Sequence, residues 1–373
     1  MKEGKGKKRK MSRRQIVRLE RSLLVLAAVL LAAVGILLVR RPARRHPETK
    51  QQAQTTEQAD SSPEAHQDTW TFSFAGDCTI GSLLEWQGTL DQDFQSVTGE
   101  NYAYPFSGVR EVFEADDFTM VNLEGTFTDS EDAVVKPYRF RGKPAYARIL
   151  KEGGVDAVSM ANNHSGDFKE EGKRDTVAAL DAAGILHSDA ASPLIFALQD
   201  GFTVGIVSYN TVDTYTGEWQ WRQDIKTDID TCKSAGCSLI FGFMHWGTVE
   251  YLPEPEAWEV SLAHDMADWG CDLIVGGHAH ILQRMEYYNE VPIFYSMGNF
   301  CYGGNTNPDD KDSVIVQAEY TWDAGRRRAR RESLRVIPCL ISSRKDRNDY
   351  CPTLCDAGSG DLRRILEKLE WSG

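Results

Sequence analysis

Several apolar runs of this chain end in polar side chains of the kinds that bind metal ions. These side chains are Asp77, Glu124, Asn163, His245, His278 and His280. Carboxylate, amide and imidazole donors in this mixture suit a transition metal of the Zn, Mn or Fe kind rather than a soft thiolate site. In layered α/β folds, ligands collect outside the carboxyl ends of the strands. The pattern therefore predicts that these six side chains line one crevice.

Each of these residues also has a purely structural interpretation. An Asp after Gly is typical of a turn or a helix cap, and a single His after a strand is often a turn residue. The pair His278 and His280 is more specific, because Gly276 and Gly277 before it let the backbone come close to a shared centre. His264, in a helical pattern, is interpreted as structural.

Short runs of β-branched and aromatic residues alternate with helical patterns from residue 69 onward. We expect strands over 69–76, 117–125, 155–163, 202–210, 238–247, 272–278, 291–299 and 313–322. Helical patterns lie over 143–154, 167–184 and 254–270. This alternation predicts an α/β layered domain over 69–342, followed by a tail over 343–373. The runs 291–300 and 313–322 lack room for a crossover helix and are expected to pair as antiparallel strands.

The first 45 residues differ from the rest in charge. They hold 14 Lys and Arg against two Glu, a net charge of +12, whereas the whole chain carries −13 and the remaining residues −25. Beyond residue 45 only Arg326 to Arg331 form a long basic run. Because phosphate contacts need a cationic surface, a body this acidic argues against nucleic acid as a partner.

Residues 22–39 form an uncharged apolar stretch of 18 residues. As a helix it would span about 27 Å, enough for a bilayer core. A cleaved signal peptide is the alternative, but this stretch exceeds the usual apolar region and RRPARR follows it. We therefore expect a basic cytoplasmic segment over 1–21, a transmembrane anchor over 22–39, and a polar linker over 40–68. The positive-inside rule places the C-terminal domain outside the cell.

Six short motifs in one order resemble a known family. They are GD at 76–77, NLEG at 122–125, ANNH at 161–164, HWG at 245–247, GGHAH at 276–280 and YSMGNF at 295–300. Together they resemble the CapA-type capsule biosynthesis proteins, which are implicated in poly-γ-glutamate synthesis or export and belong to the calcineurin-like metallophosphatase superfamily. The resemblance implies a two-sheet, four-layer α/β sandwich with a metal site holding one or two divalent ions at the sheet edge.

The resemblance also implies the roles of the metal ligands. Asp77 and His280 would bind a first metal, and Glu124 stands where the superfamily has a bridging Asp. The second metal would be bound by Asn163, His245 and His278. The superfamily has Asp-x-His at its first motif, but here the third position is Thr79. The replacement removes one imidazole from the first metal.

The resemblance and the charged residues nearby also suggest a catalytic residue and two substrate-binding residues. His164 matches the catalytic His of the superfamily and would protonate or stabilise the leaving oxygen in a metal-assisted displacement at a phosphoryl or related centre. Arg139 and Arg141 are candidates for binding an anionic group of the substrate.

Three functions follow from the resemblance as alternatives. The first is a membrane-anchored extracellular protein with metal-dependent hydrolase-like chemistry on an anionic cell-surface polymer or its precursor. The second is a non-catalytic binding or assembly subunit that works with capsule synthase subunits. The third is a general extracellular phosphoesterase.

Overall fold

A computed structural model of the chain describes residues 67–372, apart from 89, 91–92 and 213–217. The predicted cytoplasmic segment, the anchor over 22–39 and nearly all of the linker lie outside the described residues. Within the described part of the chain, no helix is long and apolar enough to cross a membrane.

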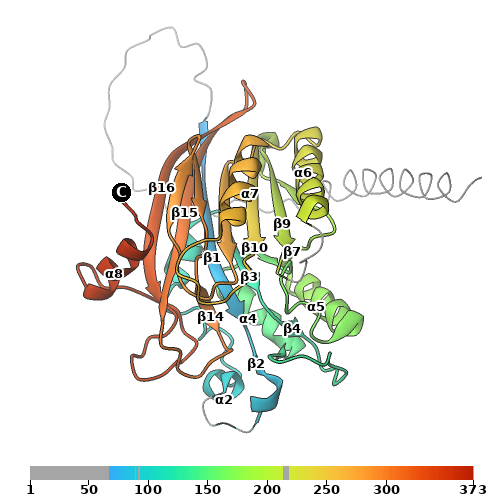
Figure 1. The fold of residues 1–373 in the computed structure, drawn as a ribbon, viewed down its shortest axis with the longest axis vertical. Helices are drawn as coiled ribbons and strands as arrows, with labels where there is room; N and C mark the ends of the chain where they lie inside the picture. Colours follow the sequence, from blue (N-terminus) through green and yellow to red (C-terminus); the bar gives the residue numbers. More distant parts are fainter. Residues whose placement is uncertain (1–66, 89, 91–92, 213–217, 373) are drawn as a thin grey trace, which may run out of the picture. The chain divides into compact units, whose positions relative to one another are not determined.

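Two large sheets and one small sheet make up the strand structure of the described residues (Figure 1). The first large sheet has the order β17 (Thr353–Leu354), β16 (Arg328–Leu340), β15 (Asp312–Asp323), β1 (Gln67–Thr79), β3 (Phe118–Leu123), β6 (Ala157–Ser159) and β7 (Leu186–Ser188), with β14 (Asn299–Tyr302) also paired to β1. The second has the order β12 (Met285–Tyr288), β13 (Val291–Phe294), β11 (Leu273–Gly277), β10 (Leu239–His245), β9 (Thr203–Asn210) and β8 (Leu194–Ala197). The small sheet consists of β2 (Ser82–Leu83), β5 (Phe140–Gly142) and β4 (Thr126–Phe127).

The described part of the chain also forms α-helices, five of which pack against the two large sheets as separate layers. The helices are α2 (Phe94–Thr98), α3 (Arg110–Ala115), α4 (Ala147–Glu152), α5 (Lys169–Ala183), α6 (Glu218–Ser234), α7 (Ala257–Asp268) and α8 (Gly360–Lys368). Residues of α3, α4 and α5 share a buried core with β1, β3 and β6. Residues of α6 and α7 share another with β9, β10 and β11. The mixed α/β organisation predicted from the sequence is thus confirmed.

The two large sheets pack against each other through an aromatic core. Phe72 and Phe74 of β1 alternate with polar residues, so both side chains point to the same face of their sheet. Both rings meet Phe241 of β10, with centroid distances of 5.1 and 5.2 Å. All three are fully buried, and each buried aromatic side chain of this size stabilises the fold by about 1.5–3 kcal/mol.

The predicted antiparallel pairing of residues 291–300 with residues 313–322 was wrong. The run 291–299 is divided between two strands, because the chain leaves the second sheet after β13 and enters the first at β14. β14 pairs parallel to β1, while β15 pairs antiparallel to β1 and β16. Gly298, with φ +67°, lies at this crossing. The crossing brings residues 295–299 to the edge where β1 and β11 end.

Residues 343–373 contribute to the same fold. β17 pairs with the end of β16, and Ile365 and Leu369 are buried in the core between the large sheets. An ion cluster holds α8 to β15: Asp312 accepts hydrogen bonds from Arg364, at 2.8 and 2.5 Å, and its carboxylate lies 2.7 Å from Lys368 Nζ. Burial by itself raises the pKa of Asp312, but these hydrogen bonds outweigh it and hold the pKa below its usual value.

We expect Asp312→Asn to lower the free energy of unfolding by about 1–3 kcal/mol at pH 7, because hydrogen bonds to charged partners are lost. Since the pKa of Asp312 is depressed in the folded protein, its contribution is present above the unfolded value of about 4 and is lost as the pH falls through the folded value. Urea unfolding at pH 7 and at lower pH measures both effects. Asp346→Asn, at the exposed pair with Arg344, is the control and should change stability by less than about 1 kcal/mol.

Candidate metal centre

The parallel strands of both large sheets end at one edge, and the predicted ligands meet there. Asp77 lies at the end of β1, Glu124 follows β3, and His280 follows β11. One ligand atom from each of these three residues lies within 4.8 Å of the other two, and all three side chains are buried. The grouping comes from strand register, which places Asp77 beside Asn122 of β3 and beside Asn299 of β14.

A second group of donors lies against Glu124. His245 Nε2, at the end of β10, is 3.6 Å from Glu124 Oε1 and 2.9 Å from Asn163 Oδ1. The ring of His278 packs against that of His245, with a centroid distance of 5.0 Å. All six predicted ligands therefore lie in two contiguous groups that meet at Glu124.

The loop after β11 approaches Asp77 very closely. The backbone N–H of His278 donates to Asp77 Oδ2 at 3.0 Å. A Cβ at Gly277 would lie 2.4 Å from Asp77 Oδ1, so any larger residue there would have to displace the Asp77 carboxylate. His278 and His280 both have positive φ, 89° and 58°, a conformation that costs non-glycine residues about 1–3 kcal/mol. The close approach expected from the two glycines is confirmed at Gly277.

Glu124 is a buried carboxylate without hydrogen-bond partners among the described residues. It is fully buried, and neither carboxylate oxygen has a hydrogen-bond partner among the described residues. Burial, followed by repulsion from Asp77 and Glu250, raises its pKa well above the usual range. Burying a carboxylate without partners costs several kcal/mol of folding free energy, and no protein group offsets the cost at Glu124 among the described residues.

The surroundings of His245 and His278 favour the neutral imidazole, the form that binds metal. Burial, followed by repulsion from His278, lowers the pKa of His245 well below its usual value. Burial, followed by repulsion from His280 and His164, lowers the pKa of His278 to about 3. His278 Nδ1 is buried and has no hydrogen-bond partner among the described residues. Neutral imidazoles beside an unpartnered carboxylate are the donor set that a divalent cation needs, so the residues fit such an ion.

His164 is held by a residue that the sequence analysis missed. Its Nδ1 lies 2.9 Å from Asp167 Oδ2, and Asp167 is completely buried. Asp167 also accepts a hydrogen bond from the backbone of Phe140 at 2.7 Å and lies 2.7 Å from Lys136 Nζ. Burial lowers the pKa of His164, although the hydrogen bond that its ring donates to Asp167 acts in the opposite direction. The position of Asp167, three residues after His164, was the available sequence signal.

Two asparagines hold the ligands in place. Asn122 Nδ2 donates to Asp77 Oδ1 at 2.8 Å and lies 3.2 Å from His245 Nδ1. Asn299 Oδ1 lies 2.9 Å from His280 Nδ1, and its amide donates to the His280 carbonyl at 3.1 Å. A hydrogen on Nδ1 directed at Asn299 leaves Nε2 of His280 as the free ligand atom. Both asparagines lie inside the NLEG and YSMGNF motifs, yet their partners are far away in sequence.

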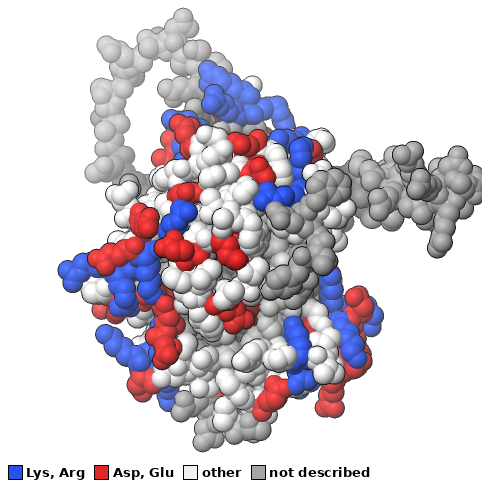
Figure 2. All heavy atoms as spheres, in the orientation of Figure 1, with Lys and Arg blue, Asp and Glu red and all other residues white. Residues whose placement is uncertain are grey.

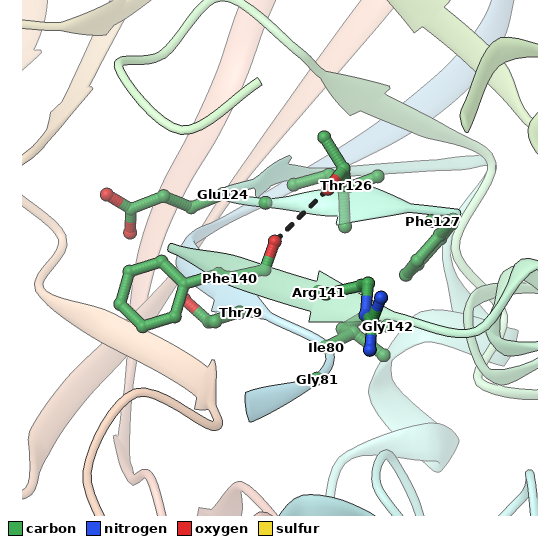
Figure 3. A pocket seen from close by; sticks show the side chains of 11 residues that line it. Thr79, Ile80, Gly81, Glu124, Thr126, Phe127, Phe140, Arg141 and Gly142 are labelled. Atoms are coloured by element: carbon green, nitrogen blue, oxygen red, sulfur yellow. Dashed lines mark hydrogen bonds between the residues drawn. The ribbon is translucent and has the colours of Figure 1, made fainter. Parts of the chain in front are cut away.

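The two arginines predicted to bind substrate each have protein partners. Arg139 pairs with Glu85, and Arg141 binds the Gln87 side chain and the Ser130 carbonyl. Figure 3 shows the Arg141 guanidinium near one end of β5 and the Glu124 carboxylate near the other. Their role in substrate binding stays a prediction. Thr79, near Glu124 in the same view, is buried, and its hydroxyl has no hydrogen-bond partner among the described residues.

Comparison with known proteins gives the family. The sequence profile of the family described as "Bacterial capsule synthesis protein PGA_cap" matches residues 71–303. The PGA biosynthesis protein CapA of Bacillus subtilis is 27% identical over 267 residues, 67% of each chain. The capsule biosynthesis protein CapA of Bacillus anthracis is 28% identical over 203 residues, 49% of this chain and 48% of that one.

The fold was also compared with solved structures. The calcineurin-like phosphoesterase YfkN from Bacillus subtilis aligns with a TM-score of 0.44 and 12% identity, covering 82% of this chain and 99% of that one. The family profile covers well over half of the present chain and includes all six predicted metal ligands. The chain belongs to the bacterial capsule synthesis protein family.

Proposed function

We propose that this chain is a metal-dependent, hydrolase-like accessory protein of capsule synthesis, acting on an anionic cell-surface polymer such as poly-γ-glutamate or on its precursor. The observation that carries the proposal is the buried Glu124 carboxylate, unpartnered between Asp77, His280 and His245. The two packed sheets and the site at their common edge support a metallophosphatase-like sandwich as the finer description of the fold.

One or two divalent ions of the Mn, Fe or Zn kind would occupy the site. Asp77 and His280 would hold the first, and Glu124 would be shared with the second. The second would be held by Asn163, His245 and His278. A bound ion would act as a Lewis acid on a phosphoryl or related centre and offset the charge that develops there.

His164 is the residue that moves a proton in this proposal. Asp167 fixes a hydrogen on His164 Nδ1, which leaves Nε2 as the atom that exchanges a proton. The buried ring is neutral in the free protein, and an anionic substrate group beside Nε2 would favour its protonated form. The protonated ring would then donate to the leaving oxygen. Lys136, paired with Asp167 and bound to the Asn163 carbonyl, joins this dyad to the second group of ligands.

The proposed location is the outer face of the cell membrane. Its support is the apolar stretch 22–39 between basic flanks, followed by an acidic body that begins after a polar linker. In this arrangement the domain faces the compartment in which a capsule polymer is exported. Capsule synthase subunits in the same membrane are the proposed protein partners.

A non-catalytic binding or assembly role is the second candidate. The observation that favours it is Thr79, which supplies a buried hydroxyl where the superfamily pattern has an imidazole ligand. A first metal held by one imidazole fewer would exchange more readily. The two candidates differ over His164: a binding subunit would form capsule normally with His164→Ala, whereas the hydrolase would not.

The metal content of the purified full-length chain tests the proposal. Elemental analysis after dialysis should find at least one equivalent of Mn, Fe or Zn in the wild type and much less in His278→Ala. His264→Ala is the matched control, since His264 lies on α7 and its ring hydrogen-bonds Glu286 of β12 rather than any of the candidate ligands. Absence of metal in the wild type, also after incubation with Mn²⁺ or Zn²⁺, would rule out the hydrolase proposal.

Asn299→Leu should weaken metal binding about 10–100-fold, the usual effect of removing the residue that orients a metal-binding histidine. The reason is that His280 Nδ1 loses its partner while every direct ligand stays in place. Competition with a chromogenic chelator measures the dissociation constant. Asn289→Leu, in the turn between β12 and β13, should leave it unchanged. Equal affinities for the Asn299 variant and the wild type would show that Asn299 does not position His280.

A further inference from the structure

The turn between β15 and β16 carries the densest positive charge in the described part of the chain. We call residues 323–331 the arginine hairpin. Its five arginines are Arg326, Arg327, Arg328, Arg330 and Arg331. Figure 2 shows basic side chains gathered at the top of the view, where this hairpin ends in Figure 1. The contrast is large, because residues 46–373 together carry a net charge of −25.

Only some of the five guanidinium groups have protein partners. Arg326 pairs with Asp323, and Arg330 pairs with Glu332. Arg331 donates to a backbone carbonyl. Arg327 and Arg328 are exposed, and no carboxylate of the described residues pairs with either of them. The hairpin therefore keeps cationic groups that are free to bind an anion.

The outer face of the hairpin is hollowed. Strand register places Arg328 opposite Asp323 and Arg330 opposite Thr321, so their side chains share one face. A cavity of about 290 Å³ lies there, lined by these four residues and Arg326. Three guanidinium groups around a cavity of this kind suit phosphate, which arginine binds through paired N–H donors. The opposite face of the hairpin is anchored in the core, where Trp322 stacks on Phe202 at 5.1 Å.

The hairpin lies beside the N-terminal end of β1. Gln67, the first residue of β1, pairs with Asp323 at the base of the hairpin. The 27 residues 40–66 connect the proposed anchor to this point. Asp77, at the other end of β1, lies about 33 Å farther along the strand, at about 3.3 Å per residue. The hairpin is thus at the end of the domain where the chain arrives from the anchor, and the candidate metal centre is at the opposite end.

We infer that the arginine hairpin docks the domain onto an anionic phospholipid surface and so directs the candidate metal centre away from the membrane. The inference rests on the membrane anchoring in the proposed function. Arginine near an anionic leaflet strengthens attachment about five-fold per residue. Docking would hold an acidic domain, otherwise repelled by that surface, in one orientation. An acidic polymer is the other polyanion that could bind arginines, but the separation of the hairpin from the metal centre favours the membrane.

Hydrogen exchange of the full-length chain in lipid nanodiscs tests the docking. The chain is inserted through its own N-terminal segment into nanodiscs of phosphatidylcholine alone or mixed with phosphatidylglycerol. Backbone exchange over 323–331 should be at least about five-fold slower in the anionic nanodiscs, and added salt should remove the difference. Arg327→Gln/Arg328→Gln should abolish the slowing. The matched control, Arg344→Gln/Lys345→Gln, removes two exposed cations beyond the other end of β16 and should preserve it.

Each other outcome overturns the inference. Equal exchange in the two lipids would show that the hairpin does not bind the membrane. Loss of the slowing in both variants would show a general charge effect. Slowing by soluble oligo-γ-glutamate but not by phosphatidylglycerol would assign the hairpin to the polymer instead. Co-elution with the nanodiscs tests the anchor separately, and a chain that does not co-elute would refute the anchor itself. The metal content is a third, independent readout and should be the same in every case.

Discussion

Glu124→Gln is expected to stabilise the metal-free protein and to abolish its response to divalent metal. Glutamine keeps the shape of the side chain but removes a buried carboxyl group, which must either stay ionised without a hydrogen-bond partner among the described residues or take up a proton on folding. The metal-free variant should therefore unfold at a free energy about 1–3 kcal/mol higher than the metal-free wild type at pH 7. Thermal or urea unfolding in the presence of a chelator measures this difference.

Added metal should make the wild type more stable to unfolding than Glu124→Gln. A ligand at 100 times its dissociation constant stabilises the folded state by about 2.7 kcal/mol, so the wild type should gain about this amount with Mn²⁺ or Zn²⁺. Glu124→Gln should gain little, because the carboxylate that neutralises the ion is gone. Glu367→Gln, at an exposed position of α8, should behave like the wild type in both conditions. A metal-free Glu124→Gln protein that is less stable than the wild type would contradict this explanation of the buried carboxylate.

His164→Ala should lower the rate of hydrolysis by about 10²–10⁴-fold while leaving the metal in place, because general acid–base catalysis contributes about this much. Asp167→Asn should have an effect of similar size, since it removes the acceptor that fixes the hydrogen on His164 Nδ1. Release of p-nitrophenol from phosphate esters with added Mn²⁺ is the rate assay, and the amount of capsule polymer is the readout in cells.

The double variant separates positioning from a general loss of structure. If Asp167 acts through His164, Asp167→Asn should cost nothing further in the His164→Ala background. Asp167 is also bonded to Phe140 and Lys136, so thermal unfolding is measured in parallel. Multiplicative losses of rate in the double variant, with stability unchanged, would mean that Asp167 acts independently of His164. Full activity of His164→Ala would favour the binding and assembly role.

The strand ends could be predicted from the sequence because each strand is a short apolar run closed by a polar residue. The structure has strands at all eight predicted positions, although the run 291–299 is divided between two sheets. The sequence gives little signal for this crossing, because residues 292–299 form one continuous buried run. The 13-residue strand β16 was missed because charged residues alternate along its exposed face.

The sequence could predict that the candidate ligands lie together, but it could not predict the residues that hold them in place. Donor type and position after a strand identify Asp77 or His245, since both properties are local. Asn122 and Asn299 act through partners 45 and 19 residues away, and only the fold brings these pairs together. The charges of Arg139 and Arg141 are visible in the sequence, but their partners Glu85 and Gln87 are 54 residues away and could not be predicted from it.

The central claim is that a divalent cation binds at Glu124 between the two groups of ligands. Anomalous scattering from crystals of the protein grown with Mn²⁺ tests it most directly. We predict a strong peak in contact with the Glu124 carboxylate and flanked by Asp77 and His280 or by His245 and Asn163. Density in which Glu124 keeps no metal neighbour, with manganese absent or bound only at the surface, would contradict the account.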